Sequence, residues 1–193
     1  ILGNIYIGRV QKIVKNLNAA FIEIQPGVNG YYPLEQCKAP VYIKKINSPS
    51  MVQGDEVLVQ IAKENLKTKL PVLSTNLNLT GKYCVLTSEN KKLGVSAKIG
   101  SEKRKELTAL FKDRPTGDFG IIVRTNAKNA SAEDILKEYK ALKEEFERIL
   151  YDGKYRTCFS CLECAAKPYL TDLKNVYTDG LEEIIVEDDE LYK

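Results

Sequence analysis

Apolar and polar residues alternate in several short stretches of the first 80 residues. The alternation runs through 5–7 and 20–24, and an aromatic pair, Tyr31 and Tyr32, follows a Gly-Val-Asn-Gly turn. Stretches of this length and period predict β-strands, and the polar break at 15–18 has the length of a hairpin turn. Further strand patterns occupy 56–61 and 72–77, while 38–50 predicts a loop or a short helical excursion. Five strands in about 80 residues predict a small closed β-barrel.

The pattern changes after residue 80. Residues 83–86 and 93–96 predict strands joined by a polar turn at 88–91, and 119–123 predicts a buried strand. Residues 101–112 predict a helix. A longer helix begins at Ser131, which forms a capping box with Asp134 and precedes apolar residues at helical spacing. Strands at 157–162 and 183–186 and a helix at 169–177 complete a mixed α/β pattern. The chain is therefore expected to belong to the α+β class.

The composition excludes several classes of protein. The 193 residues carry 29 basic and 26 acidic side chains, which is too even a balance for a purely electrostatic nucleic-acid binder. Basic residues are enriched in 1–105 and acidic residues in 182–190, so RNA is expected to bind toward the first half. No apolar run approaches the ~20 residues of a membrane span. The absence of histidine excludes, for this chain alone, every mechanism that needs an imidazole base or ligand.

The first residues and the cysteines indicate the setting of the chain. The sequence opens with Ile-Leu-Gly-Asn, without an initiator Met and without the pattern of a signal peptide, so we expect the chain to begin inside a longer protein. Five cysteines, an odd number, favour a reduced, cytoplasmic location.

The predicted strands of the first part bring aromatic and basic side chains together. Phe21 and Tyr31 are expected beside Arg9, Lys12 and Lys15. Aromatic rings stack on unpaired bases and cations neutralise phosphates, so this face is a candidate surface for single-stranded RNA. The pattern is similar to that of an OB-fold of the type named after ribosomal protein S-one. For Phe21, a place in the barrel core is an equally open alternative.

Short motifs follow one another through nearly the whole chain. They are Asn-Ala-Ala-Phe-Ile at 18–22, Gly-Tyr-Tyr-Pro-Leu at 30–34, Lys-Glu at 63–64 with Lys69 beyond, Leu-Ser-Thr-Asn at 73–76, Gly-Lys-Tyr-Cys-Val-Leu at 81–86, Gly-Val-Ser at 94–96 and Gly-Ile-Ile-Val-Arg-Thr at 120–125. In this order the series resembles the bacterial ribonuclease E/G family. The resemblance implies an OB-type RNA-binding domain at 1–80, a sensor for the 5′-monophosphate of RNA at 81–155, and part of a ribonuclease-H-like domain at 156–193.

The resemblance assigns roles to individual residues. Phe21 and Tyr31 match the aromatic pair of the family's barrel, and Lys69 matches a basic residue that contacts RNA. Arg124 and Thr125 match the pair that grips the terminal phosphate. An arginine fork with a hydroxyl suits a phosphate monoester, because the guanidinium binds two oxygens with charge assistance. From these two residues alone, a solvated arginine and a turn-capping threonine at a strand end would be the simpler interpretation.

Four more positions belong to the same expected pocket. Gly81 and Val85 match the backbone positions that complete it. Ala97 and Lys98 stand where the family often has two arginines, so the pocket lacks one charge. Lys98 is expected to compensate as a point charge.

Two other clusters suggest metal binding. Cys158, Cys161 and Cys164 have a spacing that can ligate zinc or an iron–sulfur cluster, but either needs about four ligands, so buried or free thiols are the default interpretation. The acidic run at 187–190 contains groups that can bind Mg²⁺, yet it lies among the last residues of the chain, where acids usually face solvent. We therefore assign no metal site and no catalytic residue to this chain.

The resemblance implies the RNA-binding and 5′-monophosphate-sensing part of a magnesium-dependent, single-strand-specific endoribonuclease of RNA decay and of rRNA and tRNA processing. No cofactor is then expected in this chain, while Mg²⁺ and Zn²⁺ are expected in the parent protein, downstream of it. Contacts of a homo-oligomer are expected in the same downstream regions. The alternatives are a non-catalytic RNA-binding protein associated with ribosomes or translation and, with less support, a metal-cluster protein.

Overall fold

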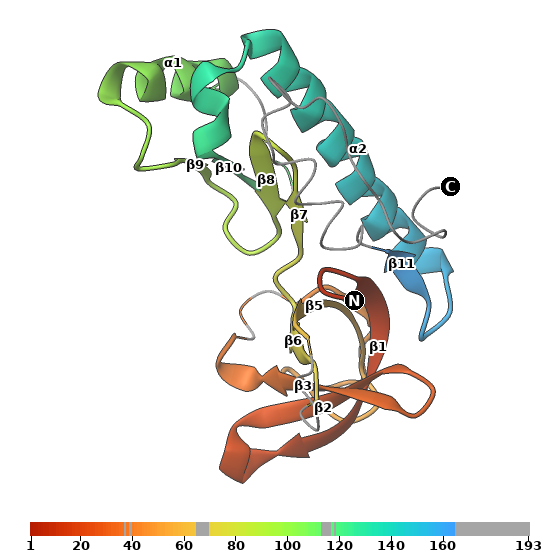
Figure 1. Cartoon of the computed structure of the whole chain (residues 1–193). Helices are drawn as coiled ribbons and strands as arrows, with labels where there is room; N and C mark the ends of the chain where they lie inside the picture. Colours follow the sequence, from red (N-terminus) through yellow and green to blue (C-terminus); the bar gives the residue numbers. More distant parts are fainter. Residues whose placement is uncertain (37, 39, 65–69, 113–116, 118, 165–193) are drawn as a thin grey trace, which may run out of the picture.

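The computed structural model describes residues 1–36, 38, 40–64, 70–112, 117 and 119–164. These residues form a β-barrel and, above it in Figure 1, a second part in which a small sheet carries two helices. The elements of the barrel part are β1 (Ile5–Val14), η1 (Lys15–Leu17), β2 (Ala19–Gln25), β3 (Val28–Pro33), η2 (Leu34–Gln36), β4 (Tyr42–Lys44), β5 (Glu56–Lys63) and β6 (Val72–Ser74). The later elements are β7 (Asn78–Thr80), β8 (Cys84–Thr87), β9 (Leu93–Val95), α1 (Ser101–Phe111), β10 (Gly120–Val123), η3 (Thr125–Asn129), α2 (Ala132–Tyr155) and β11 (Cys161–Glu163).

Five strands close the barrel in the order β1-β2-β3-β6-β5, and β5 pairs with β1 again. The pairs are antiparallel except β3 and β6, which run parallel where Tyr31 faces Val72. β4 extends the sheet beside β5, and β11 pairs with the first residues of β1. The predicted five-stranded OB-type barrel is therefore confirmed, as is the α+β class.

Alternation along β1 and β5 explains how the barrel joins the second part. Tyr6 and Val10 belong to the core cluster inside the barrel. Ile5 and Ile7, on either side of Tyr6, are also fully buried, as is Leu58 of β5. These three residues belong to a second cluster that includes apolar residues of α2 and of the small sheet. Both faces of these strands are buried because the inner face fills the barrel and the outer face packs against the rest of the chain.

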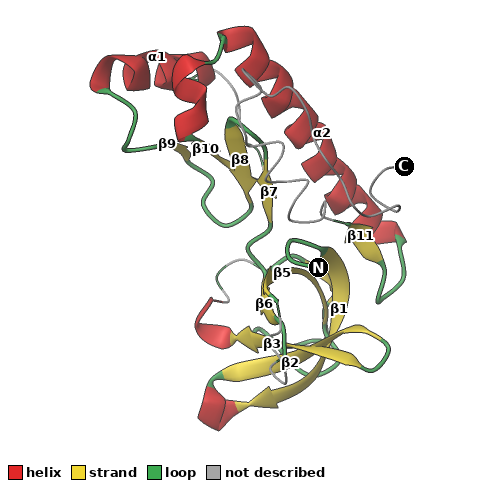
Figure 2. Cartoon of the chain, in the orientation of Figure 1, coloured by secondary structure: helices red, strands yellow, loops and turns green. Residues whose placement is uncertain are grey.

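The small sheet has the order β7-β8-β10-β9, with β9 parallel to β10 and the other pairs antiparallel. α2 begins after Ser131, whose hydroxyl accepts a hydrogen bond from the Asp134 backbone N–H at 3.1 Å, as the capping box predicts. This helix runs from the small sheet to the barrel, where it ends near β11 (Figure 2). Its 24 residues give it a length of about 36 Å.

The structure corrects three details of the sequence prediction. The segment expected to be a loop or helical excursion at 38–50 contains the short strand β4. The fifth barrel strand ends at Ser74, because Asn76 turns away and its side-chain oxygen accepts a hydrogen bond from the Thr87 hydroxyl at 2.7 Å. The two strands expected at 83–86 and 93–96 are confirmed as β8 and β9, and β10 lies between them in the sheet. The strand expected at 157–162 is reduced to β11, because Phe159 has a positive φ of 72° that no strand accommodates.

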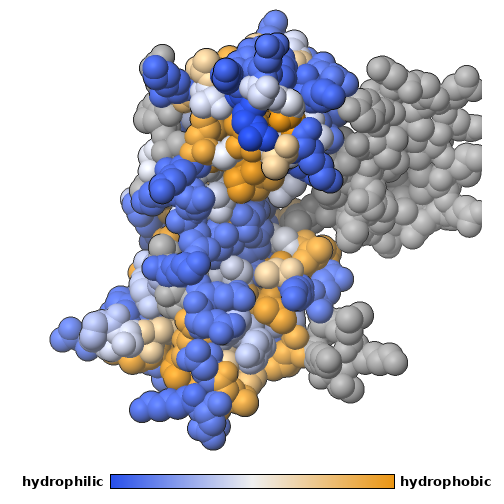
Figure 3. Space-filling model, turned by 90° about the vertical axis from the view of Figure 1, so that its left-hand side faces the viewer, coloured by the Kyte–Doolittle hydropathy of each residue, from blue (hydrophilic) through white to orange (hydrophobic). Residues whose placement is uncertain are grey.

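Several predictions fall outside the described residues. These are Lys69, the helix at 169–177, the strand at 183–186 and the acidic run at 187–190, so most of the region expected to be ribonuclease-H-like remains a prediction. None of the helices in the described ranges is long and apolar enough to cross a membrane. On the face shown in Figure 3, hydrophilic side chains cover most of the described surface and hydrophobic ones gather in patches on the upper and lower parts.

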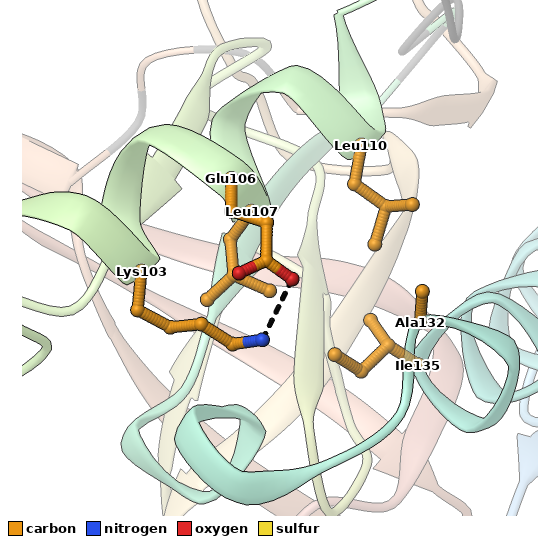
Figure 4. Close-up of a pocket in the computed structure, with 6 residues that line it drawn as sticks. All are labelled: Lys103, Glu106, Leu107, Leu110, Ala132 and Ile135. Carbon is orange, nitrogen blue, oxygen red and sulfur yellow. Dashed lines mark hydrogen bonds and ion pairs between the residues drawn. The ribbon is translucent and has the colours of Figure 1, made fainter.

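A cavity of about 190 Å³ lies between α1 and the start of α2 (Figure 4). Its wall is largely apolar, and an ion pair between Lys103 and Glu106, 2.7 Å long, lies beside it. Leu107 and Ile135 are among its lining residues and are also part of the buried core. Among the described residues, none that is assigned to RNA or phosphate binding lines this cavity, and we describe it as a packing feature between two helices.

Candidate RNA-binding surface and phosphate site

The aromatic pair of the barrel lies on the outer side of its wall. Phe21 of β2 and Tyr31 of β3 are directly opposite in register, and their rings meet edge to face with centroids 6.2 Å apart. Both side chains are half-buried and outside the two core clusters. The structure thus decides against a place for Phe21 in the barrel core. The rings form an apolar platform of the kind on which bases stack.

The basic residues expected beside this pair divide into two groups. Lys12 is exposed and faces Phe21 across β1 and β2, so a cation borders the aromatic platform. Lys15 is exposed in the following turn. Arg9 instead forms an ion pair with Glu56 at 2.9 Å and lies 5.3 Å from the centroid of the Phe159 ring. Arg9 therefore links the barrel to the segment after α2.

The expected phosphate-binding pair follows β10 directly. The Arg124 backbone N–H donates to the Tyr83 carbonyl at 2.7 Å, which keeps the extended chain against β8. The guanidinium of Arg124 donates a short hydrogen bond through Nη1 to the Gly81 carbonyl. Two residues that lie 43 positions apart in the sequence, and that were both assigned to the pocket, are thus in direct contact.

A contact between a serine and a threonine lies where β9 and β10 end. Because β9 and β10 run parallel, the residues that follow them emerge at the same edge of the sheet. The Ser96 N–H donates to the Val123 carbonyl at 2.9 Å, and the hydroxyls of Ser96 and Thr125 are 3.0 Å apart. The Lys98 backbone N–H points to the Ser96 hydroxyl at 3.4 Å, and its exposed side chain belongs to the same turn. Arg124, Thr125, Gly81 and Lys98 are therefore brought to one edge of the sheet.

Val85 has a different environment from these residues. It lies in the middle of β8, with Ile122 as its partner in β10 and Thr80 as its partner in β7. The backbone of Tyr83 faces β10 and that of Cys84 faces β7, so strand alternation directs the Val85 backbone toward β10. Its half-buried side chain lies on the sheet rather than at the edge where Arg124 and Thr125 emerge. The expected contribution of a Val85 N–H to the pocket remains a prediction.

The loop before β8 is held by a carboxylate that the sequence pattern did not reveal. Glu138 of α2 accepts hydrogen bonds from the backbone N–H groups of Lys82, Tyr83 and Cys84 at 2.7, 2.7 and 2.8 Å. Gly81 leaves room for this carboxylate, because an added Cβ would lie 2.5 Å from Cδ of Glu138 and would displace it. Burial and the charge of Glu138 together raise the pKa of the Cys84 thiol to about 12.

Arg104 of α1 is a second residue that sequence reasoning missed. Its Nη2 donates to the carbonyl oxygens of Ser96 and Ile99, both at 3.2 Å. These carbonyls belong to the turn that carries Ser96 and Lys98. In the sequence, Arg104 is one of several basic residues of an amphipathic helix, and Glu138 is one of several acids, so neither had a distinguishing signal. Ser96 belongs to the Gly-Val-Ser motif at 94–96, and nothing in that motif indicates a role for its hydroxyl.

The three clustered cysteines do not converge on one point. Cys161 Sγ and Cys164 Sγ are 3.0 Å apart, while Cys158 Sγ lies 3.7 Å from the Ile7 carbonyl. Burial, with the neighbouring Cys164, raises the pKa of the Cys161 thiol to about 12, which opposes formation of the thiolate that a metal requires. Within the described ranges, no group of three or more His, Cys, Asp or Glu side chains is arranged to hold a metal ion. The metal-cluster alternative has no support from these residues.

The fold and the site define an α+β protein in which an OB-type barrel with an outer aromatic platform is joined to a sheet edge bearing Arg124 and Thr125. A model of the ribonuclease E/G family matches residues 78–193. The chain is 32% identical to Ribonuclease E of Nostoc sp., with 79% of this chain and 23% of that protein covered. It is 30% identical to Ribonuclease G of Haemophilus influenzae over 81% of this chain and 34% of that protein. With Ribonuclease E of Escherichia coli the identity is 32%, over 75% of this chain and 15% of that protein.

The chain belongs to the ribonuclease E/G family. It spans between 15% and 34% of the length of these three curated relatives.

Proposed function

We propose that this chain is the RNA-binding and 5′-end-sensing part of a single-strand-specific endoribonuclease of RNA decay and of rRNA and tRNA processing. The barrel binds unpaired nucleotides, and the sheet edge at Arg124 binds the 5′-monophosphate. The observation that carries the proposal is the arrangement of Arg124, Thr125, Ser96 and Gly81, which come from three separate segments to one edge of the small sheet.

The phosphate site suits a monoester for chemical reasons. A 5′-monophosphate brings up to two negative charges and several acceptor oxygens. The guanidinium of Arg124 and the hydroxyls of Thr125 and Ser96 offer charged and neutral donors at one place, and Lys98 adds a point charge. A 5′-hydroxyl offers no charge to these donors. Because Ala97 replaces a basic residue that the family often has, the preference for the monophosphate is roughly tenfold.

The barrel supplies the rest of the affinity. The rings of Phe21 and Tyr31 stack on bases, and Lys12 neutralises the backbone beside them. Lys69 is a further expected RNA contact. We also propose that the magnesium-dependent cleavage and the zinc site belong to parts of the parent protein downstream of this chain.

Binding of two RNAs that differ only at the 5′ end tests the proposal. A short single-stranded RNA with a 5′-monophosphate should bind the wild-type chain about tenfold more tightly than the same RNA with a 5′-hydroxyl, measured by fluorescence anisotropy at low salt. Arg124→Ala should remove most of this difference, because charge-assisted hydrogen bonds contribute about 1.5–3 kcal/mol each. Its affinity for the 5′-hydroxyl RNA should stay nearly unchanged.

Lys128→Ala is the matched control. Lys128 lies in η3, three residues after Thr125, so this variant removes one positive charge from the same neighbourhood without touching the expected phosphate ligands. It should keep the preference for the monophosphate. Equal binding of the two RNAs by the wild-type chain would refute the sensor, and equal losses in the Lys128 and Arg124 variants would reduce it to general charge attraction.

A further inference from the structure

Glu138 and Arg104 lie on different helices, and each binds backbone groups of a segment that carries a proposed phosphate ligand. We propose that these two residues position the 5′-phosphate site: Glu138 fixes the segment of Gly81, and Arg104 fixes the turn of Ser96 and Lys98. This inference rests on the proposed function and adds to it the residues that set the geometry of the site.

The Glu138 carboxylate accepts hydrogen bonds from three backbone groups that point toward it. Three successive backbone N–H groups, those of Lys82, Tyr83 and Cys84, converge on one carboxylate within 2.8 Å. Successive N–H groups that point to one side form a concave anion-binding site, and here the anion is a side chain of the protein itself. A neutral side chain cannot satisfy all three donors equally, since an amide has one oxygen and presents its own N–H groups on the other side.

Glu138 influences the phosphate site through the position of Arg124. The segment that it holds begins next to Gly81, whose carbonyl accepts the hydrogen bond from the Arg124 guanidinium. The same segment contains Tyr83, whose carbonyl accepts from the Arg124 backbone N–H. Two of the contacts that place Arg124 therefore come from residues 81–83, and Glu138 binds the backbone of that segment.

Arg104 lies on the other side of the site and donates hydrogen bonds to the backbone, whereas Glu138 accepts them. Its guanidinium donates to the carbonyls of Ser96 and Ile99, which bracket the turn that contains Lys98. The Ser96 hydroxyl is in turn 3.0 Å from that of Thr125. A carboxylate thus binds N–H groups on one side of the site, and a guanidinium binds carbonyl groups on the other. Neither of them needs to touch the RNA.

The experiment compares Glu138→Gln and Arg104→Gln with the wild-type chain by the affinity ratio for 5′-monophosphate and 5′-hydroxyl RNA. Each variant should reduce a roughly tenfold preference to about two- to threefold, while the affinity for the 5′-hydroxyl RNA stays within about twofold. A loss confined to the monophosphate RNA separates positioning of the site from general damage to the RNA-binding surface. Circular dichroism and thermal unfolding establish that each variant is folded.

Two neighbouring substitutions provide matched controls. Glu144→Gln changes an exposed acid of α2 whose partner is Lys140 at 3.9 Å, and Lys105→Gln changes an exposed base of α1 beside Arg104. Both should retain the full preference. In a background of Arg124→Ala, Glu138→Gln should have no further effect on the ratio, because Glu138 acts through Arg124.

The outcomes separate this inference from the proposed function. If the wild-type chain shows no preference, the sensor itself is refuted. If the wild-type preference is present and persists in folded Glu138→Gln and Arg104→Gln variants, the positioning role is refuted while the sensor stands. Loss of the fold in both variants would also refute the positioning role, because the two residues would then serve the fold as a whole.

Discussion

Tyr31 and Tyr32 are neighbours in the chain, yet they lie on opposite sides of the barrel wall. Tyr32 is fully buried, and its hydroxyl lies 2.9 Å from the hydroxyl of Thr75. Tyr31 is half-buried on the outside, against the edge of the Phe21 ring. Successive strand residues point to opposite faces, so identical side chains acquire different roles from their position alone.

Replacing Tyr31 with alanine should weaken binding of single-stranded RNA by roughly 1–3 kcal/mol, because one stacking ring is lost. The matched control is Tyr31→Phe, which keeps the ring and should bind RNA nearly as tightly as the wild-type chain. Titration of a labelled 5′-hydroxyl RNA measures both, so that the phosphate site does not contribute. An unchanged affinity in a folded Tyr31→Ala variant would mean that RNA binds on another face of the barrel.

At this scale the sequence indicated where the proposed ligands lie better than it indicated the residues that support them. The outward position of Tyr31 follows from strand alternation, and Arg124 with Thr125 follows from a strand that ends just before them. Glu138 could not be found in this way, because its partners lie 54 to 56 positions away and are backbone groups, which have no signature in the sequence. Contacts that depend on how a helix packs against a distant loop require the tertiary structure.

Among the elements, β10 determines the layout of the small sheet. It separates β8 from β9 and pairs with both, antiparallel with one and parallel with the other. Its first residue, Gly120, lies close to the turn between β8 and β9. An added Cβ would be 1.6 Å from the Asn90 carbonyl oxygen in that turn. That oxygen is part of the backbone, so neither partner can move without displacing the strand or the turn.

Gly120→Ala should therefore lower the free energy of unfolding by about 3 kcal/mol or more. Gly100→Ala is a suitable comparison, because no atom lies within 4 Å of its added Cβ and its φ is −58°. This second variant should lower the stability by only about 1 kcal/mol or less, because Gly100 is the N-cap of α1 and alanine caps a helix less well than glycine. Urea unfolding followed by circular dichroism measures both, and equal stabilities of the two variants would contradict the close approach of β10 to the turn.

Elements with a long, regular pattern were predicted well, and those set by pairing partners were not. β5 and α2 have clear periodicity and appear where they were expected. β4 and β7 have three residues each, and a stretch this short becomes a strand only because a neighbouring strand offers hydrogen-bond partners. The order β8-β10-β9 could not be predicted from local pattern, since a polar turn between two strands is also compatible with a hairpin.

Across the whole molecule, the outer face of the barrel and the second part share one of the two hydrophobic clusters. Ile5, Ile7 and Leu58 on the outer face of the barrel pack in the same cluster as Phe146 and Ile149 of α2. Near the end of the helix, Gly153 lies close to the barrel, because an added Cβ would be 3.1 Å from the Ile43 side chain and 3.4 Å from that of Leu58. The barrel of this chain is thus completed on one side by residues from the other part.

A fragment of residues 1–76 should be less stable than the barrel within the whole chain and should expose an apolar face. Ile7→Thr with Leu58→Thr should improve the solubility of this fragment, because both side chains would then face water. The same pair of changes should destabilise the whole chain by about 2 kcal/mol or more, since it places hydroxyls in a buried cluster. Higher solubility of the fragment in sedimentation, together with lower stability of the whole chain in urea unfolding, would establish the shared cluster. An unchanged stability of the whole chain would exclude it.

β11 pairs Glu163 and Cys161 with Ile5 and Tyr6, so the first strand meets a partner that is synthesised more than 150 residues later. At translation rates of about 5–20 residues per second, roughly 4 to 17 seconds separate emergence of residue 80 from that of residue 163. During this interval the nascent barrel has neither α2 nor β11 against its outer face. Contacts of such high sequence separation form late and slow the folding of a chain. The order of synthesis therefore makes the ribosome-bound barrel the intermediate that most needs protection from aggregation.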